Sequence, residues 1–131
     1  MDLGEYFENT EGLGILATAD AEGNVDAAIY ARPHVMEEGT VAFIMAQGLS
    51  YRNVCVNPKA AYLFVEKGQG YKGKRLYLTK TGEQTDRQIV ESMRRRQRKD
   101  YQADKGKSRV VYFKLDKIRA LVGDDVEQVG R

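Results

Sequence analysis

The 131-residue sequence has few of the residues on which many protein sites depend. It contains one cysteine, one histidine, two prolines and no tryptophan. A single cysteine cannot form an internal disulfide, and one cysteine with one histidine cannot build a zinc site of the usual Cys/His type. No apolar run approaches the ~20 residues of a transmembrane helix. The first ten residues are acidic and lack an apolar core. The sequence therefore predicts a cytoplasmic protein with no signal peptide and no membrane partner.

The composition is that of an ordinary globular protein. Hydrophobic residues make up 42% of the chain and charged residues 31%, with a formal net charge of +2. This length predicts a single domain, residues 1–131, with one hydrophobic core. A net charge so close to zero gives no argument for a nucleic-acid partner.

The stretch from Thr40 to Val65 organises the chain. It holds two apolar runs that are typical of buried strands, Val41–Ala46 and Ala60–Val65. Between them we expect a short helix with Ser50 as its N-cap, which ends before Pro58 because the residue preceding proline is pushed out of the α region. The start of such a helix presents free N–H groups and a positive dipole end. This turn is therefore a candidate site for an anion such as a phosphate.

The flanking segments predict short strands joined by tight turns. Asp2–Asn9 fits an amphipathic helix with Leu3, Tyr6 and Phe7 on its buried side. Ile15–Ala19 and Val25–Val35 read as a hairpin, with an irregularity near its proline. From Arg109 to Val122 alternation predicts the last strand or pair of strands, and Gly123–Arg131 a frayed tail. This succession is typical of a small antiparallel barrel or sandwich.

A glycine- and lysine-rich loop lies between Lys67 and Lys74. Its glycines match G-x-G-x-x-G, which is half of a dinucleotide-binding fingerprint. The other half is missing, because Arg75–Thr79 alternates with period two and predicts a strand where the fingerprint needs a helix. We therefore expect a hairpin loop here.

The segment from Thr85 to Tyr101 predicts the one long helix, with a capping box made by Thr85 and Gln88. Its second half is strongly basic: Arg94, Arg95, Arg96, Arg98 and Lys99. Such a run indicates either a nucleic-acid or phosphate patch or a solvated face that complements the negative helix end. The solvated face is favoured, since run length alone is weak evidence and no aromatic platform is interleaved.

Catalytic constellations are mostly absent. There is no P-loop and no G-x-S-x-G motif, and the carboxylates are scattered, mainly at turns. Cys55 lies between two valines and is expected to be a small buried side chain rather than a nucleophile. A chain with an anion-ready turn but few chemical groups of its own indicates that a cofactor carries the chemistry.

The order of elements resembles the pyridoxamine 5'-phosphate oxidase-like FMN-binding split barrels. The resemblance covers residues 12–121 and is most specific in a turn, short helix, Asn-Pro stop and strand: Ser50, Arg52-Asn53, Asn57-Pro58 and Ala60–Val65. It implies a mainly β fold with flanking helices, a six-stranded antiparallel split β-barrel. It also implies a homodimer with FMN at the subunit interface.

The same resemblance implies ten cofactor-binding residues. Near the phosphate it places Ser50, Arg52, Asn53 and a basic residue of the hairpin, Arg32. Beside the rest of the cofactor it places Met45, Ala46, Gln47 and His34, with Lys74 and Arg75 from the other subunit. His34 can equally be a hairpin-end histidine bonded to a turn.

Two departures from the family pattern affect the expected function. Leu49 and Ser50 stand where a lysine is common, and the chain ends in an acidic stretch, Asp124-Asp125-Val126-Glu127, instead of a basic substrate-binding extension. Pyridoxamine phosphate oxidation is therefore not expected. The hypotheses are a flavin-dependent oxidoreductase acting on an unknown small substrate, a non-catalytic FMN-binding or electron-carrier protein, and a small nucleic-acid-binding barrel. The first two are favoured.

Overall fold

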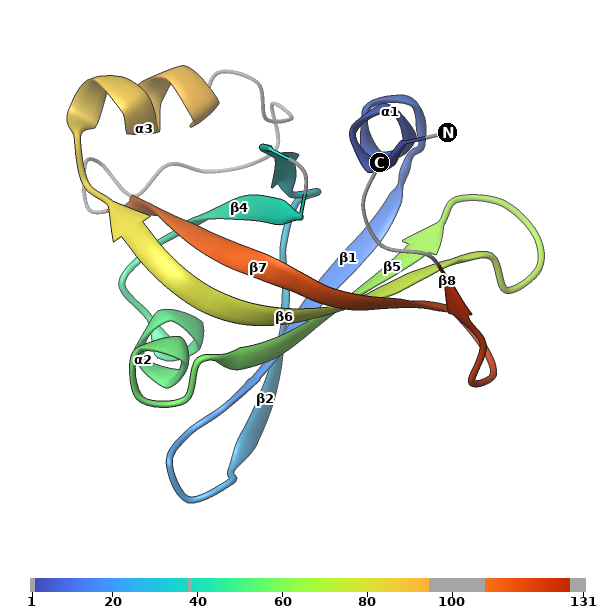
Figure 1. Cartoon of the computed structure of the whole chain (residues 1–131), viewed down its shortest axis with the longest axis horizontal. Coiled ribbons are helices and arrows are strands. Elements are labelled where there is room, and N and C mark those ends of the chain that lie inside the picture. The colour runs from blue at the N-terminus through green and yellow to red at the C-terminus, as the bar shows by residue number, and fades with distance from the viewer. Residues whose placement is uncertain (1, 38, 95–107, 128–131) are drawn as a thin grey trace.

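A computed structural model of the chain describes residues 2–37, 39–94 and 108–127. Three helices and eight strands follow one another in the order shown in Figure 1: α1 (Leu3–Asn9), β1 (Gly12–Ala19), β2 (Val25–Ile29), β3 (His34–Val35), β4 (Thr40–Met45), α2 (Leu49–Val56), β5 (Lys59–Glu66), β6 (Gly73–Gln84), α3 (Arg87–Arg94), β7 (Arg109–Ala120) and β8 (Val126–Glu127).

All strands belong to one strongly curved antiparallel sheet. Its order is β2-β1-β5-β6-β7-β4-β3, with β8 added to β7. Within the described residues β2 and β3 form the two ends of this path and do not pair with each other, so the barrel stays split. Six strands are longer than two residues, as the sequence predicted, and the short strands β3 and β8 account for the difference. The expected class, a mainly β split barrel with flanking helices, is confirmed.

The core fills the inside of the curved sheet. Along β1 the buried residues alternate with half-buried ones, because successive side chains of a strand point to opposite faces. Aromatic rings dominate the interior, with centroids 5.0 to 6.4 Å apart: Tyr6, Phe7, Tyr30, Phe43, Tyr62, Phe64 and Phe113. Their packing leaves no room for a side chain at Gly14, where a Cβ would lie 1.8 Å from the Tyr62 hydroxyl.

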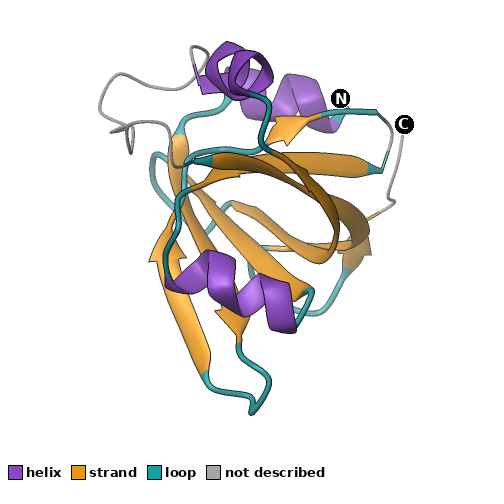
Figure 2. Ribbon diagram, turned by 90° about the vertical axis from the view of Figure 1, so that its left-hand side faces the viewer, coloured by secondary structure: helices purple, strands orange, loops and turns teal. Residues whose placement is uncertain are grey.

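The three helices close the open parts of the barrel (Figure 2). Helix α1 buries Tyr6 and Phe7, as predicted, and Asp2 caps it by accepting from the Glu5 N–H at 2.8 Å. Helix α3 packs Val90 and Met93 against Ala42, Ile44 and Val110 on the other side of β4. None of the helices in the described ranges is long and apolar enough to cross a membrane.

Several local expectations were wrong. The return strand Val25–Val35 is broken into β2 and β3, and β3 pairs with β4 rather than β1. Pro33 lies in this break, where no strand pairing requires the backbone N–H that proline lacks. The tail is not wholly frayed, since Val126 pairs with Arg119 in the register of β8 on β7.

The N-terminal cap of α3 also differs from the prediction. Asp86, not Thr85, caps it, because the Asp86 carboxylate accepts from the N–H groups of Gln88 and Ile89 at 2.9 and 3.3 Å. The described helix ends at Arg94. The remainder of the predicted helix, and with it Arg95, Arg96, Arg98 and Lys99, lies outside the described residues.

Candidate functional site

The turn between β4 and α2 is where the sequence predicted an anion site. Strand β4 ends at Met45, and α2 begins at Leu49 after three residues. The predicted N-cap was wrong: Gly48 is the N-cap residue, and Ser50 is the second residue of the helix. Glycine has no side chain that could accept a hydrogen bond from the first turn. The N–H groups of Leu49, Ser50 and Tyr51 therefore have no side-chain cap, which leaves the positive helix end available to a ligand.

Ser50 is the buried polar residue of this turn. It is 6% exposed and lies in the first turn of α2, next to the uncapped N–H groups.

Asn53 ties the same helix to the barrel. Its amide Nδ2 donates to Thr18 Oγ1 at 3.0 Å, and both residues are buried. Thr18 lies on β1, so this bond fixes α2 against a strand that is distant in the sequence. Asn57 ends the helix, as predicted, and its backbone N–H donates to the Asn53 carbonyl at 2.8 Å.

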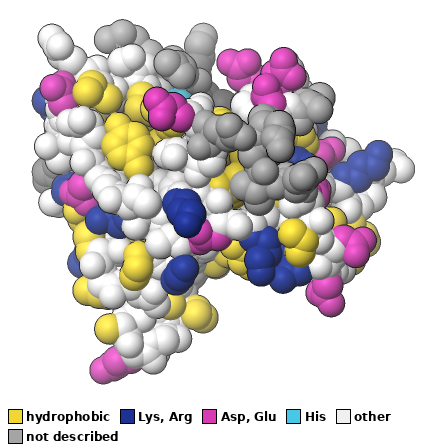
Figure 3. Space-filling view, viewed as in Figure 1, with side chains coloured by type: hydrophobic (Ala, Val, Ile, Leu, Met, Phe, Trp, Pro, Cys, Tyr) yellow, Lys and Arg dark blue, Asp and Glu magenta, His cyan; other side chains and the backbone are white. Residues whose placement is uncertain are grey.

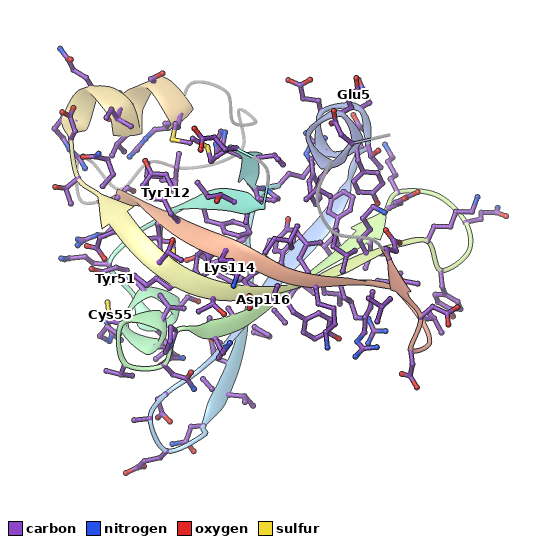
Figure 4. All side chains as sticks on the ribbon, viewed as in Figure 1. Glu5, Tyr51, Cys55, Tyr112, Lys114 and Asp116 are labelled. Atoms are coloured by element: carbon purple, nitrogen blue, oxygen red, sulfur yellow. The ribbon has the colours of Figure 1, made fainter. Side chains whose placement is uncertain are left out.

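A charged group at the ends of β6 and β7 was not predicted from the sequence. The Tyr51 hydroxyl donates to the Glu83 carboxylate at 2.8 Å and accepts from Arg109 Nη1 at 3.1 Å. The Arg109 guanidinium also stacks on the Tyr51 ring, with 4.4 Å from Cζ to the ring centroid. Lys80 completes the group, since its Nζ lies 3.2 Å from Glu83 Oε1. Figure 4 shows Tyr51 on the side of α2 that faces β6 and β7.

This environment changes the acidity of two members of the group. Burial is the main cause that raises the pKa of Tyr51 to about 12, and hydrogen bonds with Cys55 and Glu83 act in the same direction, while the Arg109 charge opposes them. Burial also opposes ionisation of Glu83. Hydrogen bonds from Tyr51 and Lys80 outweigh it, so the pKa of Glu83 is lower than usual. At neutral pH the group therefore holds an ionised carboxylate and a neutral tyrosine.

Six of the ten predicted site residues lie in one continuous segment around this turn: Met45, Ala46, Gln47, Ser50, Arg52 and Asn53. Met45 is fully buried, whereas the side chains of Gln47 and Arg52 are exposed. Arg52 contributes its backbone N–H to the first intrahelical bond, with the Gly48 carbonyl at 3.0 Å.

Arg32 and His34 lie on the connection between β2 and β4. The Arg32 Nη1 atom donates to the carbonyls of Phe7 and Thr10, at 2.9 and 2.6 Å, and so satisfies the C-terminal end of α1. His34 is half-buried in β3, opposite Ala42 of β4. Arg32 thus has a structural role that its position in the sequence did not indicate.

Lys74 and Arg75 lie at the start of β6, next to β8. Lys74 Nζ pairs with Glu127 Oε1 at 2.7 Å and lies over the Tyr6 ring. Arg75 donates to the Ala120 carbonyl at 2.8 Å and to the Gly123 carbonyl. Neither residue is brought to the β4–α2 turn within one chain. Figure 3 shows further basic side chains on the face around β7.

Cys55 was expected to be buried, and this was wrong. It lies on the exposed side of α2, next to Tyr51 (Figure 4). The helix periodicity explains the error, because the buried positions of α2 are Ser50, Asn53 and Val54. Alternation between two valines does not report which side of a helix faces solvent.

No protein-family model matches the sequence, and no curated protein does. Solved structures do match. An FMN-binding protein from Syntrophomonas wolfei superposes with a TM-score of 0.74 at 16% identity, over 93% of this chain and 85% of that one. The heme storage protein HutZ from Vibrio cholerae superposes with a TM-score of 0.67 at 16% identity, over 88% of this chain and 89% of that one. A protein from Lactobacillus delbrueckii named as a predicted pyridoxamine 5'-phosphate oxidase gives 0.66 at 19% identity, over 88% of each chain.

Identities this low show a shared fold and not a shared activity. The match nevertheless extends over most of every chain compared. The chain therefore has the split-barrel fold of the pyridoxamine 5'-phosphate oxidase-like proteins.

Proposed function

We propose that this protein binds FMN, with the FMN phosphate at the start of α2. The observation that carries the proposal is the first turn of α2, which no side chain caps and which contains the buried residue Ser50. A phosphate oxygen accepts hydrogen bonds from N–H groups and from a hydroxyl, and its charge favours the positive helix end. The donors present thus fit a phosphate monoester.

Five other predicted residues are compatible with the same placement. Met45, Ala46 and Gln47 precede the helix and would border the cofactor, while Arg52 and Asn53 follow Ser50 on α2. FMN transfers electrons, so we propose a flavin-dependent oxidoreductase acting on a small substrate, with an electron-carrier protein as the alternative. One solved structure with this fold is a heme storage protein. The identity of the bound cofactor is therefore tested first.

The experiment is a titration of the cofactor-free protein with FMN, followed by flavin fluorescence. Saturable binding at a ratio of one FMN per chain is expected, with Ser50→Ala weaker by about tenfold, because a hydrogen bond to a charged group contributes about 1.5–3 kcal/mol. Ser92→Ala, an exposed serine on α3, serves as the matched control. Absence of FMN binding, or a heme spectrum in the purified protein, would contradict the proposal.

We further propose that two copies of the chain form a dimer through the outer face of β2, β1 and β5. The strand register places ten apolar residues side by side on this face: Leu13, Ile15, Ala17, Ala19, Val25, Ala27, Ile29, Ala61, Leu63 and Val65. Val25 and Ile29 are 82% and 69% exposed in the single chain. A continuous apolar face of this size is typical of a protein–protein interface. Arg75, opposite Leu63, borders it.

Light scattering tests the dimer. The wild type is expected to have about twice the mass of one chain at micromolar concentration. Ile29→Glu places a charge on the proposed interface and should give a monomer, whereas Val122→Glu, at an exposed position outside this face, should not. A monomeric wild type would contradict the proposal.

A further inference from the structure

The β1–β2 hairpin is an acidic segment of the chain. Between Gly12 and Ala31 the sequence contains the carboxylates of Asp20, Glu22 and Asp26 and no lysine, arginine or histidine. The Asp20 carboxylate accepts hydrogen bonds from backbone N–H groups of the turn, and Glu22 is exposed. No cation of the described residues forms an ion pair with any of the three. Their negative charges are therefore not neutralised within one chain.

The outer surface of β5, β6 and β7 is basic. Arg75 of β6 lies opposite Arg119 of β7, and Tyr77 lies opposite Lys117. Like charges directly opposite each other repel, so this arrangement is unfavourable for a chain on its own. Lys117 Nζ and Arg119 Cζ lie 5.8 and 5.5 Å from the centroid of the Tyr77 ring. We call the basic residues of this surface the basic face: Lys59, Arg75, Lys114, Lys117 and Arg119.

Two lysines of the basic face share one carboxylate. Asp116 Oδ2 lies 3.8 Å from Lys59 Nζ, and Asp116 Oδ1 lies 4.0 Å from Lys114 Nζ. Asp116 also accepts from the hydroxyl of Thr79, which lies between the two lysines in the strand register. Figure 4 shows Lys114 and Asp116 next to each other on β7. One carboxylate neutralises one of these lysines and leaves the charge of the other.

The other three cations of the basic face have no carboxylate partner among the described residues. Arg75 and Arg119 donate to main-chain carbonyls at the end of β7 and in the loop after it. A carbonyl satisfies the N–H groups without neutralising the charge. Asp124 and Asp125 lie in the same loop and form no ion pair with the basic face. Even with both of them counted beside Asp116, five cations stand against three carboxylates.

The acidic hairpin and the basic face lie on opposite sides of the apolar surface proposed for the dimer. The strand order places β2 on one side of β1 and β5, and β6 and β7 on the other. In an isologous dimer the same surface of both copies meets across a two-fold axis. An axis that runs along β1 and β5 brings β2 of each copy against β6 and β7 of the other. The opposite charges then meet twice, once on each side of the axis.

We propose that the β1–β2 hairpin of each copy docks on the basic face of a second copy, with its carboxylates against the lysines and arginines. This inference rests on the proposed dimer and adds to it the charges that determine how the two copies are oriented. Apolar surface supplies affinity without a preferred direction, whereas complementary charges fix the orientation and exclude others.

Two charge-reversed variants test the docking. Glu22→Lys with Asp26→Lys makes the hairpin positive, and Lys114→Glu with Lys117→Glu makes the basic face negative. Each variant alone should dimerise more weakly by about tenfold or more, because like charges then meet at both contacts. An equimolar mixture should form a heterodimer with an affinity close to that of the wild type, since every contact again joins opposite charges. Sedimentation equilibrium measures the dissociation constants, and native mass spectrometry identifies the heterodimer.

The control is Glu5→Lys with Glu8→Lys, at exposed positions of α1, which changes the net charge as the hairpin variant does and should leave the dimer unchanged. In the wild type the dissociation constant should rise with salt concentration, because salt screens exposed charges. A constant that does not rise would overturn the inference, and so would a mixture that dimerises no better than the separate variants.

Two other outcomes separate this inference from its alternatives. The wild type could bind a single-stranded oligonucleotide that Lys114→Glu with Lys117→Glu no longer binds, while the dimer stays as strong as before. That result would assign the basic face to nucleic acid and overturn the inference. A monomeric wild type would refute the proposed dimer itself, and this inference with it.

Discussion

The buried bond between Asn53 and Thr18 allows the fold and the site to be tested separately. Asn53 was expected near the phosphate, yet its amide Nδ2 donates to Thr18 Oγ1 at 3.0 Å. Thr18 lies on β1 and Asn53 in the middle of α2. Replacing Asn53 by leucine, which has a similar volume, removes the donor and leaves the Thr18 hydroxyl buried without it.

The expected cost follows from the burial of both residues, which are 4% and 3% exposed. A buried polar group left without its partner destabilises a protein by about 1–3 kcal/mol. Asn53→Leu and Thr18→Val should each lower the free energy of unfolding by an amount in this range. The double variant has no unpaired group left, so it should cost less than the sum of the two, with a coupling of about 1 kcal/mol.

Urea unfolding at a fixed protein concentration measures these free energies, with Arg52→Ala as the exposed control on the same helix. FMN titration of the same variants separates the two roles of Asn53. If Asn53 only positions the helix, Asn53→Leu and Thr18→Val should weaken FMN to a similar extent.

Two results would refute this reasoning. Strictly additive costs would show that the bond contributes nothing to stability. A loss of FMN binding in Asn53→Leu that Thr18→Val does not share would instead place Asn53 in direct contact with the cofactor.

Two further predictions concern the interior of the barrel. Gly14→Ala should lower the free energy of unfolding by about 1–3 kcal/mol, because its Cβ would lie 1.8 Å from the Tyr62 hydroxyl and 2.6 Å from the Tyr30 carbonyl. Gly82→Ala has open space around it and should change the free energy of unfolding by no more than about 0.5 kcal/mol. Equal urea midpoints for the two variants would contradict this prediction. Burial raises the pKa of Tyr6, Tyr51 and Tyr62 above the usual 10.0. As the pH rises from about 10, these tyrosines therefore lose their protons in the unfolded chain before they do in the folded one, and the free energy of unfolding should fall. Urea unfolding across this pH range, with Tyr62→Phe giving a shallower slope, checks this, and a flat profile would contradict it.

Much of the fold could be predicted because its signals are local. The apolar run at β4, the Asn57-Pro58 stop of α2 and the alternation in β6 and β7 all depend on neighbours within a few residues. These segments were found near their observed positions, and their order was enough to indicate a split barrel. The errors occurred at element ends, where a cap or a break depends on one side chain: Gly48 in place of Ser50, Asp86 in place of Thr85, and the interruption near Pro33.

The site divides in the same way between local sequence and tertiary structure. The sequence by itself predicted a turn and a short helix after β4, and the six predicted residues lie along them because they are close together in the sequence. Only the tertiary structure decided which charges meet them. Tyr51 and Arg109 are 58 positions apart, and Tyr51 and Glu83 are 32 apart. They come together because β7 pairs with both β4 and β6, which brings the start of β7 and the end of β6 to the helix. Long-range strand pairing of this kind leaves no periodic signal in a single sequence, and so the contacts of Arg109 with Tyr51 and Glu83 could be found only from the structure.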